Sequence, residues 1–126
     1  MRRTIATRLK QSQNTCASLT TVQRVDMSAV IDWRARHREA VADSHGVRLG
    51  YMGFFAKATS LAAQAVPQVN ASIDTQKEII TYRDYVDISI AVSTPKGLVT
   101  PVVRDCEAKS IIEIEKDVAA MAKKVR

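Results

Sequence analysis

The sequence predicts an α/β domain of the α+β type, in which helices cover a mixed sheet. Apolar residues recur at helical spacing over 28–44 and 111–125. Apolar and small or polar residues alternate from Val86 to Ser93, which is typical of a half-buried strand. The resulting order of elements (helix, strand, two helices, several strands, helix) fits a sheet with helices on at least one face.

The first quarter of the chain predicts a helix followed by a strand. Residues 2–15 form a short basic helix in which Ile5 and Leu9 share one side. Residues 18–25 are rich in β-branched and apolar side chains, and they favour a strand.

The second predicted helix has recognisable ends. Asp26 or Ser28 can cap its start, and it runs to about Ser44 and stops at Gly46. Arg34 and Arg38 lie one i+4 step apart on a basic strip of this helix. The neighbouring side carries Val30, Trp33, His37 and Val41.

Two further helices follow. Residues 51–66 are apolar on nearly every side except for Lys57, so this helix is expected to be buried, and Pro67 ends it. The stretch 110–113, Ser-Ile-Ile-Glu, is a capping box that begins the last helix.

Between these helices the pattern predicts two hairpins. Residues 69–73 and 79–82 read as strands on either side of a turn. Residues 86–93 and 98–103 read as a second pair, joined by the turn Thr-Pro-Lys-Gly at 94–97.

Composition limits the function classes. A chain of 126 residues with 46% hydrophobic residues is one domain at most, and it has no apolar run long enough to span a membrane. The net charge of +6 attracts anions: a nucleic acid, a phosphate-bearing cofactor or an acidic partner. Nucleic acid is disfavoured because the chain lacks an exposed aromatic series and a basic recognition helix. Cys16 and Cys106 are too few for a metal site.

The residues themselves indicate no catalytic apparatus. For His37 the sequence offers only Asp32 or Glu39 as an orienting carboxylate, and a place on a partly buried helix face explains this histidine. His45 precedes Gly46 at a helix end, where its cation interacts with the helix dipole. There is no glycine-rich loop between a strand and a helix, so neither a dinucleotide fold nor a phosphate-binding loop is indicated.

Eight short segments nevertheless carry a resemblance. The pieces RLK, QNT, SLTT, VDMS, VNA, YRDY, VDIS and GLVTPVVR occur in this order along the chain. In order and spacing the chain resembles the succinyltransferases among the 2-oxoacid dehydrogenase acyltransferases. The resemblance identifies residues 1–126 as the N-terminal half of the catalytic domain, with the lipoyl and subunit-binding domains absent from it. It implies a fold like that of chloramphenicol acetyltransferase, incomplete in this chain.

The resemblance also implies a reaction and its setting. A succinyl group passes between dihydrolipoamide and coenzyme A within the 2-oxoglutarate dehydrogenase complex of the tricarboxylic acid cycle. The lipoyl group is carried on a separate domain, and no metal, nucleic acid or membrane is implied. Expected partners are further copies, in trimers and a cubic core, with the 2-oxoglutarate dehydrogenase and dihydrolipoyl dehydrogenase components. The expected location is the mitochondrial matrix in a eukaryote and the cytoplasm in a bacterium.

The implied site residues concern binding alone. Arg34, Thr100 and Arg104 are the expected contacts to coenzyme A. The family's catalytic motifs, D-H-R-x-x-D-G and F-T-I-x-N, do not occur in the 126 residues, so no catalytic residue is assigned and the polypeptide is expected to be inactive alone. The family's T-T-F-N-E-V-D also differs here, where Val-Gln-Arg occupies positions 22–24.

Three alternatives stay open at this stage. The chain can be a truncated, non-enzymatic product that binds full-length acyltransferase subunits. It can be an acetyl or branched-chain acyltransferase relative. It can also be a basic nucleic-acid binder, a function that only the net positive charge suggests.

Overall fold

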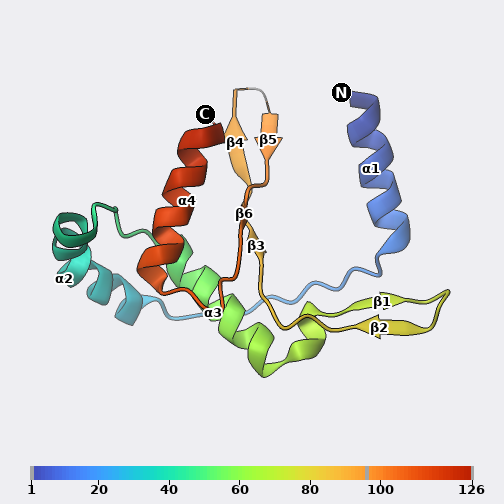
Figure 1. Ribbon diagram of the computed structural model, residues 1–126, viewed down its shortest axis with the longest axis horizontal. Coiled ribbons are helices and arrows are strands. Elements are labelled where there is room, and N and C mark those ends of the chain that lie inside the picture. Colours follow the sequence, from blue (N-terminus) through green and yellow to red (C-terminus); the bar gives the residue numbers. More distant parts are fainter. Residues whose placement is uncertain (1, 96, 126) are drawn as a thin grey trace.

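The computed structural model describes residues 2–95 and 97–125, with side chains as far as Lys124. Four α-helices and one 3-10 helix lie within these ranges (Figure 1). They are α1 (Arg2–Thr15), α2 (Ser28–His45), α3 (Met52–Ala65), the short helix η1 (Pro67–Asn70) and α4 (Ile111–Val125). No helix of the described ranges is long and apolar enough to cross a membrane.

In the described part of the chain the strands form three antiparallel pairs, and helices and strands together give the α/β class that the sequence predicts. β1 pairs with β2, β3 with β6, and β4 with β5. Their bounds are β1 Ser72–Asp74, β2 Ile79–Thr81, β3 Ile88–Ser89, β4 Val92–Thr94, β5 Gly97–Val99 and β6 Val102–Val103.

The two predicted hairpins are confirmed, and the second is interrupted by a proline. Ile88 pairs with Val103 and Thr94 with Gly97, so one register runs through both short ladders. Between them, the Ile90 amide donates to the carbonyl oxygen of Pro101 at 3.1 Å. Proline has no N–H with which to return that bond, and the ladder therefore breaks there. Figure 1 shows β3, β6, β4 and β5 as one upright ribbon.

The core lies where α3, α4 and the foot of this hairpin meet (Figure 1). Its fully or nearly fully buried members are Ala56, Val103, Cys106 and Ile114. A second cluster joins the end of α2 to the connection before α3, and it contains Val41, Val47 and Leu49 with Phe54 packed against them.

A buried carboxylate ties the two central helices together. Glu115 of α4 is 6% exposed, and its Oε1 accepts the backbone N–H of Gly53 at 2.8 Å. That amide belongs to the first turn of α3, where N–H groups have no partner within the helix. Only glycine fits here, because a Cβ on residue 53 would lie 2.7 Å from Cγ of Glu115.

The predicted end of α2 and the predicted start of α4 are confirmed, whereas the predicted cap at the start of α2 is wrong. The Gly46 amide donates to Ala42 at 2.9 Å from a left-handed conformation, φ +64°, which glycine adopts without strain. At the start of α2 the N-cap residue is Met27, which makes no side-chain capping hydrogen bond, and Asp26 before it accepts hydrogen bonds from the amide and the hydroxyl of Ser28 at 2.9 and 2.6 Å. At α4 the Glu113 carboxylate accepts the Ser110 amide at 2.7 Å, as a capping box requires.

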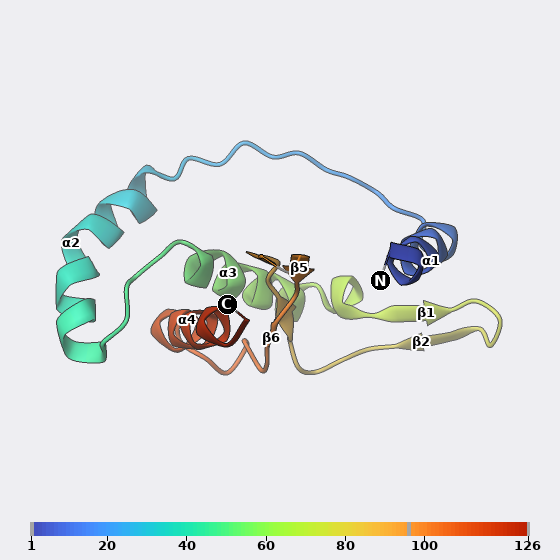
Figure 2. The ribbon, with the colours of Figure 1, turned by 90° about the horizontal axis from the view of Figure 1, so that it is seen from above.

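The strand predicted over 18–25 is wrong. The segment is extended but unpaired, and Leu19 and Val22 are each 89% exposed. A strand needs a partner for its backbone groups, and Figure 2 shows this segment crossing from α1 to α2 apart from the strands. The strand predicted to begin at residue 69 is also shorter than expected, because Val69 belongs to η1.

The prediction that the third helix is buried is wrong for this chain. Only Gly53, Ala56 and Ser60 of α3 are buried, and they face α4 and the turn before it. Phe55 and Leu61 are 51% and 54% exposed. The apolar face of α3 opposite α4 is therefore uncovered.

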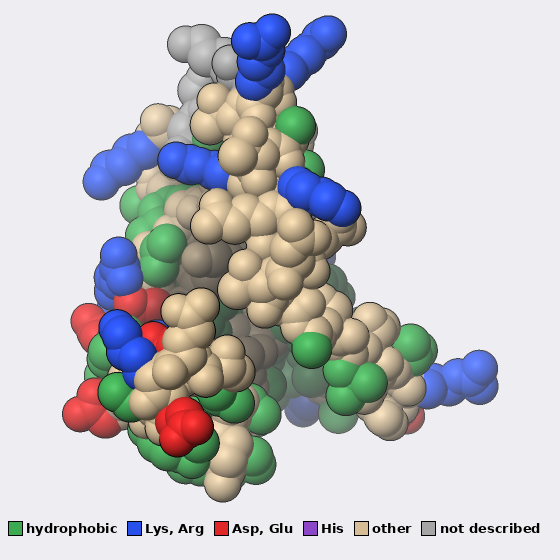
Figure 3. Space-filling model, turned by 90° about the vertical axis from the view of Figure 1, so that its right-hand side faces the viewer, with side chains coloured by type: hydrophobic (Ala, Val, Ile, Leu, Met, Phe, Trp, Pro, Cys, Tyr) green, Lys and Arg blue, Asp and Glu red, His purple; other side chains and the backbone are tan. Residues whose placement is uncertain are grey.

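The basic N-terminal helix stands apart from the core. α1 has no buried residue, and both Ile5 and Leu9 are exposed. Figure 3 shows Lys and Arg side chains projecting on the side of the molecule where α1 lies. The helix carries Arg2, Arg3, Arg8 and Lys10 and no acidic residue.

Candidate functional site

Arg34 is held in one orientation by two contacts outside its own helix. Its Nε donates to the carbonyl oxygen of the fully buried Leu49 at 2.8 Å. Its guanidinium carbon lies 4.7 Å from the centre of the Tyr51 ring, a cation–π arrangement. Neither contact neutralises the charge, and within the described residues no carboxylate pairs with Arg34. The two Nη groups are therefore the donors that remain for an anion.

The rest of the basic strip on α2 is less fixed. Arg38 reaches Glu39 at 3.8 Å, with both side chains more than half exposed. Such an exposed ion pair contributes little to stability and does not fix the orientation of the side chain. Arg36 donates only to the carbonyl oxygen of Asp32, one turn earlier in its own helix, at 3.3 Å. Arg34 is thus the member of the strip that the fold positions.

Arg104 has a carboxylate partner. It follows β6 and forms an ion pair with Asp87, the residue before β3. The other oxygen of Asp87 accepts the Asp105 amide at 3.0 Å. The hydrogen bond from Arg104, followed by that from Asp105, holds the pKa of the Asp87 carboxyl below its usual value. The positive charge of Arg104 is consequently compensated within the chain.

The turn after Arg104 is clamped from several sides. Lys109 Nζ donates to the Arg104 carbonyl oxygen and to Asp117 of α4, both at 2.7 Å. Asp105 adopts φ +51°, a strained conformation for a residue with a side chain. This turn is a fixed base for the hairpin.

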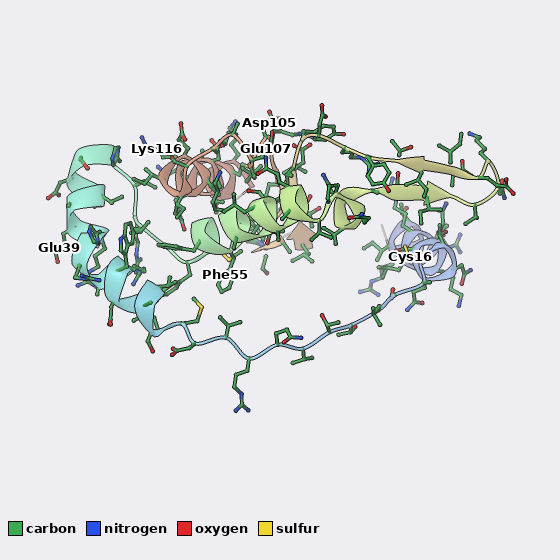
Figure 4. All side chains as sticks on the ribbon, turned by 90° about the horizontal axis from the view of Figure 1, so that it is seen from below. Cys16, Glu39, Phe55, Asp105, Glu107 and Lys116 are labelled. Carbon is green, nitrogen blue, oxygen red and sulfur yellow. The ribbon has the colours of Figure 1, made fainter. Side chains whose placement is uncertain are left out.

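The opposite side of the turn is held by α3 and by the chain before β3. Lys57 Nζ donates to the Glu107 carbonyl oxygen at 2.9 Å, which explains the lone charge on an otherwise apolar helix. The Glu107 carboxylate accepts the Val86 amide at 2.7 Å. Figure 4 shows Asp105 and Glu107 together near the start of α4, whereas Phe55 lies on the other side of α3.

Thr100 lies in the break of the long hairpin. It falls between β5 and β6, next to Pro101, and it is exposed. The hairpin thus presents Thr100 to solvent.

The three predicted coenzyme A contacts are not gathered into one pocket by this chain. Thr100 and Arg104 share the long hairpin, whereas Arg34 belongs to α2, which Figures 1 and 2 show at one end of the molecule. Of the three, Arg34 combines a fixed orientation with an uncompensated charge. Arg104 is also held in place, but its charge is compensated by Asp87.

Neither histidine is arranged for acid–base chemistry. The His37 ring stacks on Trp33, with ring centres 4.3 Å apart, and its Nδ1 lies 2.7 Å from the Trp33 carbonyl oxygen. His45 ends α2. In the described part of the chain no group of His, Cys, Asp and Glu side chains could hold a metal ion.

The buried thiol is a core group. Cys106 is fully buried and lies 3.4 Å from the Val103 carbonyl oxygen. Burial raises the pKa of its thiol, which favours the neutral form.

Two relevant side chains were missed from the sequence. The partnership of Asp87 with Arg104 has a signal: the hairpin register that pairs Ile88 with Val103 sets Asp87 opposite Arg104. No signal in the sequence indicates the role of Tyr51, because its contact with Arg34 depends on how α2 packs against the connection to α3.

Comparison with known proteins assigns the chain to a family. A family model described as 2-oxoacid dehydrogenases acyltransferase (catalytic domain) matches residues 1–126. The mitochondrial dihydrolipoyllysine-residue succinyltransferase component of the 2-oxoglutarate dehydrogenase complex of Homo sapiens is 49% identical over all of this chain and 28% of its own length. The mitochondrial Saccharomyces cerevisiae protein of that name is 50% identical, over 27% of its length. The corresponding component of Bartonella vinsonii is 50% identical, over 30%. The chain thus spans less than a third of these relatives.

Solved structures share the fold. A dihydrolipoamide acetyltransferase of Azotobacter vinelandii aligns with a TM-score of 0.91 and 29% identity, over 98% of this chain and 51% of that one. The cubic core of a pyruvate dehydrogenase multienzyme complex aligns with the same score and identity, over 99% and 51%. These likenesses confirm the acyltransferase fold predicted from the sequence. By fold and by a sequence match along its whole length, the chain belongs to the 2-oxoacid dehydrogenase acyltransferase (catalytic domain) family.

Proposed function

We propose that this chain forms part of a catalytic domain that transfers a succinyl group between dihydrolipoamide and coenzyme A. The observation that carries the proposal is the difference in identity between two kinds of relative. Named succinyltransferases are 49–50% identical over all 126 residues, whereas a dihydrolipoamide acetyltransferase of the same fold is 29% identical. That difference favours succinyl over acetyl transfer.

In this reaction the 126 residues contribute contacts that bind coenzyme A. Coenzyme A carries a diphosphate and a 3′-phosphate, and a guanidinium with free Nη donors forms strong, charge-assisted hydrogen bonds to phosphate. Arg34 meets this requirement because its Nε is fixed by Leu49 and its charge has no carboxylate partner in the described chain. Arg104 and Thr100 are proposed as further contacts from the long hairpin, with the paired Arg104 the weaker of the two cations.

The acid–base step falls to groups outside these 126 residues. Acyl transfer to a thiol needs a general base for the thiol proton and a donor for the oxyanion of the tetrahedral intermediate. The stacked His37 and the helix-terminal His45 are not placed for that task. The chain covers 51% of the solved catalytic chains that it resembles, so there is room for these groups elsewhere in the domain.

The proposed assembly is a trimer and a cubic core of such domains. A structure of the same fold is itself a cubic core, and this chain exposes large apolar side chains that an assembly can cover. Within it, the 2-oxoglutarate dehydrogenase and dihydrolipoyl dehydrogenase components are the proposed partners. We place the protein in the mitochondrial matrix of a eukaryote, as the names of its eukaryotic relatives suggest, or in the cytoplasm of a bacterium.

A chimera tests the proposal. The 126 residues replace the matching segment of the Saccharomyces cerevisiae succinyltransferase, which is 50% identical to them, and purified cores are assayed with succinyl-CoA and with acetyl-CoA as acyl donors to dihydrolipoamide. We expect succinyl transfer within about tenfold of the parent and a clear preference for succinyl-CoA. An assembled core that prefers acetyl-CoA, or transfers neither group, would contradict the proposal.

The exposed apolar surface also favours a second, non-enzymatic function, in which the 126 residues bind full-length acyltransferase subunits. Leu19, Val22, Ile73 and Leu98 are each at least 69% exposed, which is costly for a free polypeptide. Co-expression with tagged full-length subunits tests this function. Recovery of the 126-residue chain in the purified cores supports it, and its exclusion from them contradicts it.

A further inference from the structure

A second oriented guanidinium lies at the base of the ribbon that β1 and β2 form. Arg83 follows β2 by two residues and is partly buried. Its Nη1 donates to the carbonyl oxygen of Asn70 at 3.2 Å, and its Nη2 donates to Oγ of Ser72 at 3.1 Å. Asn70 in turn donates from Nδ2 to the Tyr85 carbonyl oxygen at 2.8 Å. The segment that carries Arg83 is thus tied to η1 and to the start of β1.

The charge of Arg83 has no partner of opposite sign in the described part of the chain. Both of its acceptors are neutral, and a guanidinium has five N–H donors, so donors remain for an anion. Other cations of the strands and of the turn before α4 are compensated, in the ion pairs Lys77–Asp74, Arg104–Asp87 and Lys109–Asp117. The fold therefore orients Arg83 without neutralising it.

The proposed reaction supplies an anion that this guanidinium fits. A succinyl group has a free carboxylate that an acetyl group lacks, and this carboxylate stays charged throughout the transfer. Such a charge is costly to remove from water unless a cation pairs with it. Guanidinium and carboxylate groups are planar and form charge-assisted hydrogen bonds, frequently as a bidentate pair. A domain that prefers succinyl over acetyl donors therefore benefits from a group such as Arg83 near the acyl chain.

The place of Arg83 agrees with the direction in which coenzyme A is expected to run. Arg34, the proposed phosphate contact, belongs to α2 at one end of the molecule, whereas β1 and β2 lie at the other end with the long hairpin between them (Figures 1 and 2). The thiol of coenzyme A, which carries the acyl group, is at the opposite end of the molecule from the nucleotide. A coenzyme held at Arg34 and along the long hairpin therefore directs its acyl group away from α2.

We propose that Arg83 binds the free carboxylate of the succinyl group and thereby selects succinyl over acetyl donors. The proposal rests on the proposed function, which supplies the substrate, and it adds a residue that determines acyl specificity. The contacts to Asn70 and Ser72 fix the direction of the guanidinium, so the specificity depends on its charge and on its orientation together.

The active chimera that carries these 126 residues tests the proposal with three acyl donors. Succinyl-CoA has the free carboxylate, acetyl-CoA lacks it, and the coenzyme A thioester of monomethyl succinate has nearly the same length as succinyl-CoA but no charge on the acyl group. Arg83→Gln removes the positive charge. Lys77→Gln is the matched control, because Lys77 is an exposed cation of the same ribbon. The kcat/KM is measured for each donor with dihydrolipoamide as the acceptor.

We expect Arg83→Gln to lower kcat/KM for succinyl-CoA roughly tenfold to hundredfold, as the loss of one charge-assisted contact does, and to leave the two uncharged donors within about twofold of the parent. Lys77→Gln should use all three donors as the parent does. An equal fall for all three donors would show that Arg83 only holds the ribbon in place and would overturn the proposal. An unchanged kcat/KM for succinyl-CoA would overturn it as well.

If the Arg83→Gln protein does not assemble, Arg83→Lys decides the question. Lysine keeps the charge but cannot form the forked pair, so the preference for succinyl-CoA over the monomethyl thioester should fall below that of the parent. A preference equal to the parent's would contradict the proposal. A parent chimera that forms no succinyl-dihydrolipoamide would refute the proposed function itself, whereas an active chimera that is insensitive to changes at Arg83 would refute this assignment alone.

Discussion

Replacement of Gly53 by alanine tests the packing of the two central helices. A Cβ at residue 53 would lie 2.7 Å from Cγ of Glu115 and 2.9 Å from the carbonyl oxygen of Ile111. The second atom belongs to the backbone at the start of α4, so it cannot turn aside as a side chain could. Either α3 and α4 move apart or Glu115 leaves its place, and we expect Gly53→Ala to destabilise the protein.

Opposing effects set the magnitude. Alanine in place of glycine favours a helix by about 1 kcal/mol. Overpacking of a well-packed contact costs about 1–3 kcal/mol. Displacement of Glu115 breaks its hydrogen bond to the Gly53 amide, and an unpaired buried partner costs a further ~1–3 kcal/mol. The net expectation is a loss of about 1–5 kcal/mol in the free energy of unfolding.

Denaturant unfolding of a full-length protein that carries this sequence measures the change, with Gly46→Ala as the matched control. Gly46 has φ +64°, and a Cβ on it would meet no other atom within 4 Å. Alanine there therefore incurs only the cost of a left-handed backbone, about 1 kcal/mol. A Gly53→Ala protein as stable as its parent, or more stable, would refute the reasoning.

Three further outcomes are expected. Because the pKa of Asp87 is lowered in the folded protein, its ion pair stabilises the fold above the unfolded pKa of about 4 and is lost as the pH falls through the folded value; Asp87→Asn should flatten the acid side of the melting-temperature profile, and an unchanged profile would contradict this. The 126-residue polypeptide alone should form no succinyl-dihydrolipoamide from succinyl-CoA, since a missing general base costs about two to four orders of magnitude; a turnover near one per second would contradict this. The same polypeptide should aggregate, with Phe55, Leu61 and Ile73 each more than half exposed, and a sharp cooperative melt of a soluble monomer would show otherwise.

Local signals in the sequence predicted those elements whose ends are decided locally. Gly46 ends α2 through its own left-handed conformation, and Ser110 with Glu113 begins α4 through a reciprocal pair of hydrogen bonds. The long hairpin was also predictable, because alternation and the turn before Gly97 fix its register.

Elements that depend on distant partners were not predictable in this way. Residues 18–25 have the composition of a strand, yet no strand lies beside them to accept their hydrogen bonds. The apolar face of α3 predicts burial, but a pattern cannot say whether this chain supplies the cover, and Phe55 is half exposed.

In the candidate site, too, the sequence predicted the local features and not those that depend on tertiary packing. The basic strip that contains Arg34 is visible in the sequence, and the resemblance to acyltransferases gave it a ligand. The contacts that single out Arg34, with Leu49 and Tyr51, arise from tertiary packing between α2 and the connection to α3.

The central claim, that these residues bind coenzyme A within a succinyltransferase, is tested most directly by steady-state kinetics of the Arg34→Ala protein in the active chimera. A charge-assisted contact to phosphate is worth about 1.5–3 kcal/mol, so the KM for coenzyme A should rise roughly tenfold to hundredfold. The effect should shrink as salt is raised, while kcat and the KM for dihydrolipoamide stay near those of the parent. An assembled Arg34→Ala protein with an unchanged KM for coenzyme A would contradict the account and leave Arg34 as a purely structural link between α2 and the connection to α3.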